Sequence, residues 1–236
     1  MRFKNKNYGC LLIHGFTGGP HEVRILADYL NSKGIYTYTP ALPGHESRDP
    51  SDLKNISYND WIKAAADGFF YVANECKHVI VGGFSMGGLL AAQAAHRFNP
   101  DGFISINAPI FVLNIKNAIL NSFNDIKLDM HKHNVDYRNL TNVPLSALHQ
   151  LRLLINSTKP ILGNIKCPAL VCQSVYDEAV KSISANYIFD KLENDRKMLI
   201  EYQNSNHFIH MTQDVELLCY DVYEFFETIA SSKKDV

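Results

Sequence analysis

The sequence predicts an α/β protein whose mostly parallel sheet of about six strands is flanked by helices. Short runs rich in β-branched and aromatic residues alternate with helical patterns of about a dozen residues, which is typical of crossover units that feed a parallel sheet. The strand-like runs are apolar on both faces, as expected for strands covered by helices on each side. The 236 residues, 46% hydrophobic and 20% charged, suit one globular core, so we expect a single domain over residues 1–236.

The expected elements alternate along the chain. The expected strands are Tyr8–His14, Ile35–Ala41, His78–Phe84, Gly102–Asn107, Ala169–Ser174 and Met198–Gln203. The expected helices have apolar residues recurring at three and four positions, and they are His21–Ser32, Asn59–Asn74, Met86–His96, Ile183–Leu192 and Val215–Ile229.

One stretch interrupts this alternation. Between Pro109 and Cys167 there is no convincing strand, but two helix-like patterns cover Val112–Met130 and Leu145–Ser157. The stretch is too long for a bare loop in a compact domain. We therefore predict a helical cap inserted at about residues 110–166, lying over one edge of the sheet.

The charge balance and the apolar runs exclude several kinds of partner. Lys and Arg total 23 and Asp and Glu total 24, which gives a formal charge of −1. No long block of charges of one sign is present that could bind a phosphate backbone. We expect no nucleic acid partner.

No apolar run reaches the ~18 residues that cross a bilayer, and the N-terminus lacks the long apolar region of a signal peptide. We expect no stable membrane insertion and a cytoplasmic location, and the oligomeric state stays open.

Cysteine usage indicates neither a disulfide framework nor a metal site. The cysteines are odd in number and unrelated in spacing, so we expect reduced, mostly buried thiols and no metal. They are Cys10, Cys76, Cys167, Cys172 and Cys219.

A Gly-x-Ser-x-Gly motif is the first sign of chemistry. Gly83-Phe84-Ser85-Met86-Gly87 ends an apolar strand and begins a helix, which is the context that a nucleophile elbow requires. The turn is so sharp that glycines are needed at both flanks, Gly83 and Gly87, while the serine hydroxyl is lifted clear. Ser85 is the candidate nucleophile. The alternative is a serine that only caps the helix.

A serine hydroxyl needs an adjacent base, and the base needs an orienting carboxylate. Asp177 and His207 each follow one of the last two expected strands, in the order Ser, Asp, His that elbow serines on such sheets take. We predict His207 as general base and Asp177 as the acid that orients it. Asp177 precedes a helix expected to open at Glu178, so it could instead cap that helix. Glu178 is the rival carboxylate and His210 the rival base.

The oxyanion hole needs two backbone donors. One is expected to be the N–H of Met86, the residue after the nucleophile. The second is expected from the glycine-rich loop His14-Gly15-Phe16-Thr17-Gly18-Gly19-Pro20, where the N–H of Phe16 can face the nucleophile. We expect His14 to serve the hydrogen bonding of this loop and not catalysis.

Several motifs, in order, resemble those of the small bacterial carboxylesterases and monoacylglycerol lipases of the α/β-hydrolase superfamily. The resemblance covers nearly the whole chain and rests on His14-Gly15-Phe16-Thr17-Gly18, Pro20-His21-Glu22, Pro43-Gly44-His45, Gly83-Phe84-Ser85-Met86-Gly87-Gly88, Cys167-Pro168-Ala169-Leu170-Val171 with Asp177, and Ser205-Asn206-His207.

This resemblance implies the α/β-hydrolase fold with a small helical cap. It also implies a serine esterase that needs no cofactor and acts on esters of short to medium acyl chains or on monoacylglycerols. The initial antiparallel strands of larger family members are expected to be absent. The sequence departs from the family most in Phe111–Lys166, which leaves the alcohol group of the small-molecule ester open.

The cap suggests an apolar substrate pocket. Phe111, Ile115, Leu151 and Leu154 are its candidate lining residues, and they suit an apolar acyl chain better than a charged one. Each could equally belong to the core of the cap.

Two other readings of the function remain. A thioesterase, an acyltransferase or a small-amide hydrolase would use the same residues. A non-catalytic ligand receptor on the same scaffold is the competing class, and the complete set of catalytic candidates disfavours it.

Overall fold

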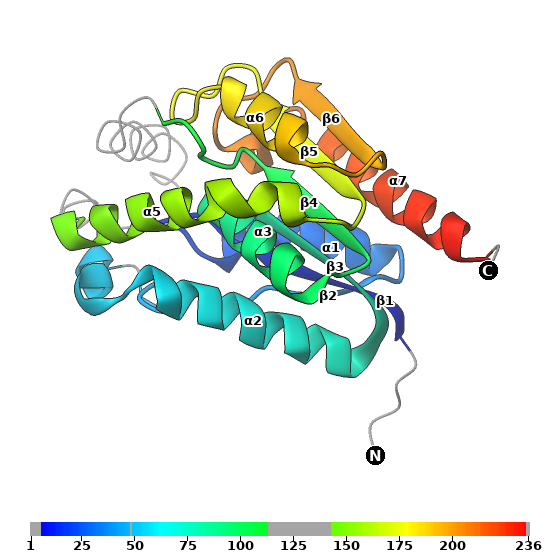
Figure 1. Ribbon diagram of the computed structural model, residues 1–236, viewed down its shortest axis with the longest axis horizontal. Coiled ribbons are helices and arrows are strands. Elements are labelled where there is room, and N and C mark those ends of the chain that lie inside the picture. The colour runs from blue at the N-terminus through cyan, green and yellow to red at the C-terminus, as the bar shows by residue number, and fades with distance from the viewer. Residues whose placement is uncertain (1–5, 48, 113–142, 235–236) are drawn as a thin grey trace.

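A computed structural model of the protein describes residues 6–47, 49–112 and 143–234, and at its centre lies a sheet of six strands (Figure 1). The strand order is β2-β1-β3-β4-β5-β6, and all five pairings between neighbours are parallel. The predicted parallel sheet is confirmed. The strands are β1 Lys6–Ile13, β2 Tyr36–Tyr38, β3 Cys76–Phe84, β4 Gly102–Ile106, β5 Ala169–Ser174 and β6 Lys197–Tyr202.

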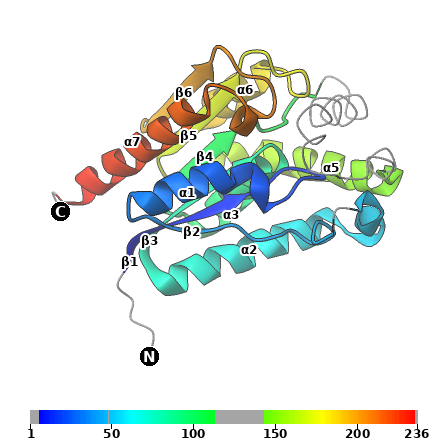
Figure 2. The same ribbon diagram turned by 180° about the vertical axis from the view of Figure 1, so that it is seen from behind.

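Helices cover both faces of the sheet. One face carries α1 (Arg24–Ser32) and α7 (Val215–Lys234), as Figure 2 shows. The other face carries α2 (Tyr58–Glu75), α3 (Met86–Phe98), α5 (Leu145–Thr158) and α6 (Ile183–Lys191). Short 3₁₀ helices lie in the connections, namely η1 Pro20–Val23, η2 Pro50–Asn55, η4 Lys159–Asn164 and η5 Ile209–Met211.

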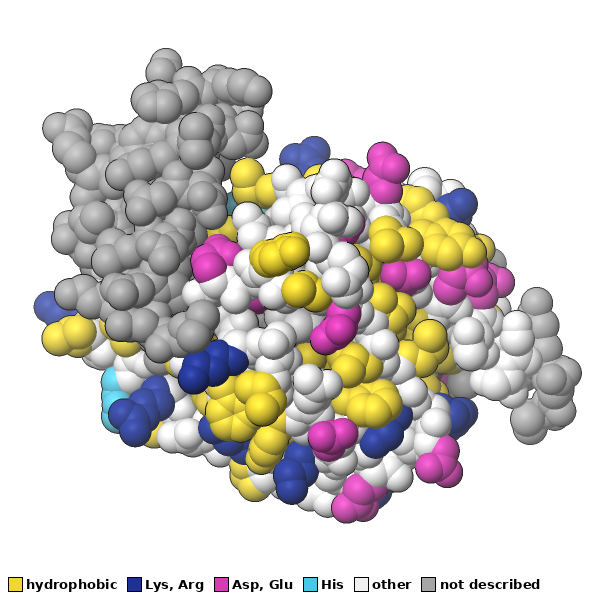
Figure 3. Space-filling model, turned by 90° about the horizontal axis from the view of Figure 1, so that it is seen from above, with side chains coloured by type: hydrophobic (Ala, Val, Ile, Leu, Met, Phe, Trp, Pro, Cys, Tyr) yellow, Lys and Arg dark blue, Asp and Glu magenta, His cyan; other side chains and the backbone are white. Residues whose placement is uncertain are grey.

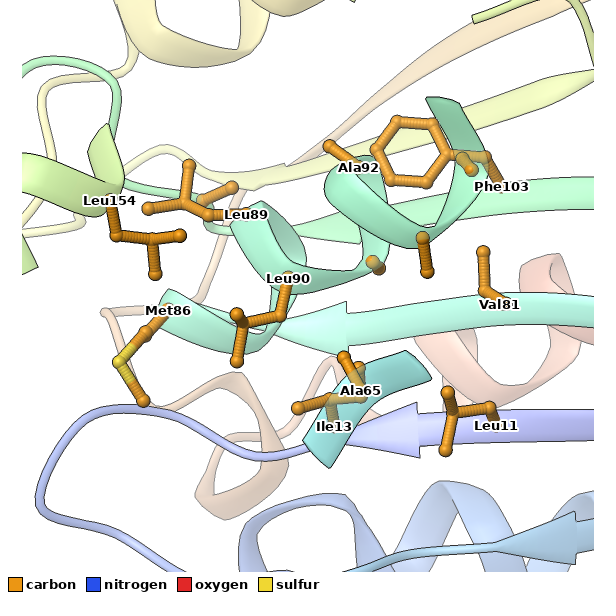
Figure 4. Close-up of a cluster of buried hydrophobic side chains, with 14 of the residues drawn as sticks. Leu11, Ile13, Ala65, Val81, Met86, Leu89, Leu90, Ala92, Phe103 and Leu154 are labelled. Atoms are coloured by element: carbon orange, nitrogen blue, oxygen red, sulfur yellow. The ribbon is translucent and has the colours of Figure 1, made fainter. Parts of the chain in front are cut away.

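The hydrophobic core forms two layers because successive side chains of a strand point to opposite faces. In β1, Cys10 and Leu12 belong to the layer under α1 and α7, whereas Leu11 and Ile13 belong to the layer under α2 and α3. Figure 4 shows the second layer, in which Ile13 lies near Leu90 of α3. The strands are therefore buried on both faces, as their continuous apolar runs predict.

The predicted elements are present, with shifted ends that have local causes. β2 covers Tyr36–Tyr38 instead of Ile35–Ala41, and it ends shortly before Pro40, which has no N–H to donate. β4 stops before Asn107, whose φ of 48° leaves the extended conformation. The helix expected from His21 starts as the 3₁₀ helix η1.

Part of the predicted cap is described. Helix α5 matches the second expected cap helix, and it packs against α3 and α2 as part of the main core. The first expected cap helix, Val112–Met130, lies almost entirely outside the described residues. The single-domain boundary with a cap at about residues 110–166 therefore stays a prediction.

The exterior carries mixed side chains. Figure 3 shows basic, acidic and hydrophobic side chains interspersed over the visible face. Within the described residues, no helix is long and apolar enough to span a bilayer. All five cysteines are free thiols and buried, as expected.

Candidate active site

Ser85 stands in a sharp turn between β3 and α3. Its φ of 53° and ψ of −122° lie in a region that residues other than glycine rarely adopt. A Cβ on Gly83 would collide with the Gly87 carbonyl, and a Cβ on Gly87 would collide with the Ile13 carbonyl oxygen. The two flanking glycines are therefore required by close backbone contact, as the elbow motif predicts.

The Ser85 hydroxyl does not cap α3. Its Oγ lies 3.1 Å from Nε2 of His207, while its backbone N–H donates to the Ile106 carbonyl at 2.8 Å. The hydroxyl is therefore free of the helix and bonded to an imidazole, and the capping alternative is not what the side chain does.

His207 links the serine to a carboxylate. Its Nδ1 lies 2.8 Å from Oδ2 of Asp177, which requires the tautomer with the proton on Nδ1 and leaves Nε2 to accept the Ser85 hydroxyl. Burial alone would lower the pKa of His207, but the charges of Asp177, Glu178 and Glu22, with the Asp177 hydrogen bond, raise it.

Asp177 both orients the imidazole and caps a turn. Its Oδ1 accepts the backbone N–H groups of Ala179 (2.9 Å) and Val180 (2.7 Å), and the Gln173 amide approaches its Oδ2 at 3.4 Å. The two readings of Asp177 are thus compatible. The expectation that a helix opens at Glu178 is wrong, since these bonds close only a turn and α6 starts at Ile183.

The rival residues take other positions. Oε2 of Glu178 accepts the backbone N–H of His207 at 3.4 Å and does not bond its ring. His210 packs edge-on against Phe84 and Phe208, with ring centroids 5.5 and 5.7 Å away. Its Nδ1 is buried without a partner among the described residues. Geometry therefore places His207 and Asp177, and neither rival, in the hydrogen-bonded chain to Ser85.

The glycine-rich loop after β1 runs beside the nucleophile. A Cβ on Gly15 would lie 3.2 Å from the Cβ of Ser85. Within this loop, Gly15 N–H donates to Glu22 Oε2 (2.8 Å) and Thr17 N–H to His45 Nε2 (3.1 Å). Among the described residues, nothing accepts the N–H of Phe16.

The N–H of Met86 has no acceptor in the described parts of the chain either. Both expected oxyanion donors are therefore available, and their role stays a prediction.

Two histidines tie this loop to the loop before η2. His14 Nε2 accepts the N–H of Leu42 at 3.1 Å, while its Nδ1 lies 2.9 Å from the Gly15 carbonyl oxygen. His45 bonds Thr17 and, through Nδ1, the Pro43 carbonyl oxygen at 3.2 Å. Burial lowers the pKa of His14 to about 3 and also lowers that of His45. The expected role of His14 in the loop is confirmed.

Asn107 joins the ends of β4 and β5 to the loop that carries His207. Its Nδ2 donates to the His207 carbonyl oxygen and to Ser174 Oγ, each at 2.9 Å. Its Oδ1 accepts the Ser174 N–H at 2.8 Å. The amide is buried and uses its donor and acceptor atoms.

Sequence reasoning missed three polar residues at the site: Glu22, His45 and Asn107. Glu22 and His45 lie in motifs that carried the family resemblance, Pro20-His21-Glu22 and Pro43-Gly44-His45, so a signal existed. No signal in the sequence identifies Asn107, because only folding brings it next to His207.

The candidate pocket residues are partly described. Leu151 and Leu154 of α5 are buried in the core layer that contains Met86, and Figure 4 shows Leu154 between Leu89 and Met86. Phe111 is half-buried against Tyr187. Ile115 lies outside the described residues. A pocket lined by these residues remains a prediction.

A metal centre has no counterpart in the described parts of the chain, where no group of three or more His, Cys, Asp or Glu side chains could hold an ion.

Fold and site together define a class. A parallel sheet covered by helices, an elbow serine, and a hydrogen-bonded histidine and aspartate in that chain order are the features of α/β-hydrolases. The profile of the alpha/beta hydrolase family matches residues 10–217, and the chain belongs to this family.

Relatives match over nearly the full length. The chain is 30% identical over 231 residues to the thermostable monoacylglycerol lipase of Bacillus sp. (strain H-257), covering 94% of this chain and 92% of that protein. It is 29% identical over 235 residues to a carboxylesterase of Bacillus subtilis (strain 168), covering 96% and 95%. The family resemblance read from the motifs is confirmed.

Solved structures agree in fold. The monoacylglycerol lipase of Paleococcus ferrophilus superposes with a TM-score of 0.72 at 14% identity, covering 94% of each chain. A chain from the work on the metagenome-derived lipolytic enzymes LipS and LipT gives 0.77 at 22% identity, also over 94% of each chain. These likenesses support the α/β-hydrolase fold, which is confirmed.

The half-buried His210, whose Nδ1 is shielded from solvent, should make stability depend on pH. Burial lowers its pKa to about 3, so the native state keeps it neutral, whereas the unfolded chain takes up a proton once the pH falls below about 6.5. Stability from this group is complete above pH ~6.5 and is lost as the pH falls toward 3. His210→Phe keeps the aromatic packing without titrating, so between about pH 7.5 and pH 5 the wild type should lose about 2 kcal/mol more than this variant.

Urea unfolding of both proteins at the two pH values measures this difference. His207 and the carboxylates contribute equally to the pH dependence of both proteins, so their contributions cancel. An equal pH dependence of the two proteins would contradict a His210 that stays neutral in the native state.

Proposed function

We propose that the chain is a serine hydrolase that cleaves carboxylic esters of short to medium acyl chains, or monoacylglycerols, through an acyl-enzyme. The observation that carries the proposal is the hydrogen-bonded chain from Ser85 through His207 to Asp177 beside two free backbone N–H groups. The names of the two relatives, a monoacylglycerol lipase and a carboxylesterase, support ester bonds as the target.

In this mechanism Ser85 Oγ attacks the ester carbonyl while Nε2 of His207 takes the hydroxyl proton. The imidazolium then gives that proton to the departing alkoxide, which leaves as the alcohol. Asp177 holds Nδ1–H and stabilises the imidazolium without becoming protonated. Water attacks the acyl-enzyme, His207 takes its proton and returns it to Ser85, and the carboxylic acid leaves.

The N–H groups of Phe16 and Met86 are proposed to bind the oxyanion. Negative charge on the carbonyl oxygen develops only in the transition state, so donors fixed in advance lower the barrier more than they strengthen substrate binding. Met86 has its N–H at the first turn of α3, where backbone donors have no partner within the helix.

We propose that the site binds an apolar acyl chain. Phe111, Leu151 and Leu154 are the described candidates for that end of a pocket, all of them apolar, and none would stabilise a charged acyl group. Thioester hydrolysis or acyl transfer would use the same triad, so rates on p-nitrophenyl esters, monoacylglycerols and acyl thioesters decide between them. The proposal needs no cofactor, and it includes a cytoplasmic location.

Ser85→Ala should abolish turnover, leaving only the ~10³–10⁴-fold advantage over water that an oxyanion hole and binding supply in comparable triads. The fold should survive, because the hydroxyl caps nothing. Hydrolysis of a p-nitrophenyl ester measures the loss, and a fluorophosphonate should label the wild type but not the variant. Near wild-type rates in Ser85→Ala, or an unlabelled wild type, would contradict the proposal; the latter outcome would favour a ligand receptor.

Asp177→Asn should lower kcat by several orders of magnitude, about 10⁴-fold in comparable triads, because an amide favours the wrong imidazole tautomer. Glu178→Gln is the matched control and should cost little, since Glu178 meets only the backbone of His207. Steady-state kinetics on one ester measures both. The reverse order of effects would move the orienting role to Glu178.

The pH dependence should identify the base. A neutral imidazole must accept the Ser85 proton, so kcat/KM should rise with pH through an apparent pKa above the ordinary value of ~6.5, since the neighbouring carboxylates raise the pKa of His207. His207→Ala should remove this limb with the activity. His210→Ala should retain the limb and change mainly stability. If His210→Ala were inactive while His207→Ala stayed active, His210 would be the base and His207 would not.

A further inference from the structure

Glu22 is a buried carboxylate that the proposed mechanism does not use. It lies in η1, directly after the glycine-rich loop, and only 6% of the residue is exposed. Within the described residues, no Lys or Arg forms an ion pair with it. A buried carboxylate is costly unless hydrogen bonds replace its water, and here backbone N–H groups of the loop do so.

The carboxylate lies beneath the loop, close to the nucleophile. A Cβ on Gly18 would collide with all the atoms of the Glu22 carboxylate. A Cβ on Gly15 would touch Glu22 Oε2 on one side and the Cβ of Ser85 on the other, each at 3.2 Å. The two glycines therefore leave the space that the carboxylate fills, and one methyl group would span the distance from it to Ser85.

The hydrogen bonds of the loop leave one donor free. Gly15 N–H donates to Glu22 at 2.8 Å, Thr17 N–H donates to His45 at 3.1 Å, and Gly18 N–H turns back to the Gly15 carbonyl oxygen at 3.4 Å. Phe16, between the first two, is the one residue of this run whose N–H has no acceptor among the described residues. The direction of that N–H is thus set by its bonded neighbours.

We propose that Glu22 is a positioning residue that holds the peptides of Gly15–Gly18 so that the Phe16 N–H stays aimed at the oxyanion. The inference rests on the proposed function. Glu22 acts through the loop and touches no reacting atom. Glu22 and the loop stabilise each other. Burial raises the pKa of Glu22 to about 7, and backbone hydrogen bonds from Gly15 and Gly19 oppose that rise. The loop N–H groups thus stabilise the same charge that orders them.

The test is Glu22→Gln in the full chain. The amide keeps the size and one acceptor oxygen but places an NH₂ among backbone donors, so the loop should shift. Removing an oxyanion donor outright costs 10²–10³ in kcat in subtilisin, so a misaligned donor should lower kcat for a p-nitrophenyl ester by about 10- to 100-fold. KM should change less than about threefold, because the donor acts in the transition state.

A second readout separates positioning from a merely structural role. A trifluoromethyl ketone forms a tetrahedral adduct on the serine and places its oxyanion in the hole, so its affinity should fall by the same factor as kcat/KM. Asp101→Asn is the matched control, since Asp101 also accepts a backbone N–H, that of Val79 at 2.7 Å, but at the far end of β3. It should alter stability and leave the ketone's affinity unchanged.

A second variant covers the case in which Glu22→Gln does not fold. Gly18→Ala should displace the carboxylate and give the same joint fall in kcat and in ketone affinity. A folded Glu22→Gln or Gly18→Ala with wild-type kcat and ketone affinity, or with a change in KM alone, would overturn the inference. If the wild type itself fails to react with the fluorophosphonate, the proposed function fails instead.

Discussion

The backbone of the elbow lies against the end of β1 so closely that no side chain fits between them, and the rest of the site is arranged around this contact. A Cβ on Gly87 would collide with the Ile13 carbonyl oxygen. β1 and β3 are neighbours in the sheet and run parallel, so they end at the same edge. The loop that carries Phe16 therefore begins beside the helix that carries Met86. Sheet order therefore brings the two proposed oxyanion donors to the edge that carries the nucleophile, and neither loop could do so alone.

A second tie connects the elbow to the histidine loop through β4. The Ile106 carbonyl oxygen accepts the Ser85 N–H at 2.8 Å, and the next residue, Asn107, donates from Nδ2 to the His207 carbonyl oxygen at 2.9 Å. One dipeptide thus contacts the backbones of the proposed nucleophile and of the proposed base. A buried amide whose donor and acceptor are both used fixes geometry at little cost, because no polar atom is left without a partner. The positive φ values of Ser85 and Asn107 occur on the two sides of this tie.

The sequence predicts the proposed triad because each of its signals is local. An elbow is read from five consecutive residues, and a strand end is read from the apolar run before it, so Ser85, Asp177 and His207 follow without coordinates. The supporting residues require distances between remote parts of the chain, and Asn107 lies 100 positions from the residue whose carbonyl it binds. The local reading of Asp177 also failed in one detail. Its Oδ1 accepts two backbone N–H groups as a helix cap would, but the turn does not continue as a helix, and α6 begins only at Ile183.

The histidines of the site have opposite charge preferences, and their surroundings explain the difference. His14 and His45 accept backbone N–H groups through Nε2, which only a neutral ring can do, and burial lowers both pKa values accordingly. His207 is buried as well, but Asp177, Glu178 and Glu22 surround it with negative charge and raise its pKa. The imidazolium of His207 forms only when the Ser85 proton moves, so the charge of Asp177, which bonds the ring, stabilises the transition state more than the resting state. Burial thus keeps His14 and His45 neutral, as fixed acceptors that shape the loop. His207 is also buried, but the carboxylates beside it leave it able to take a proton.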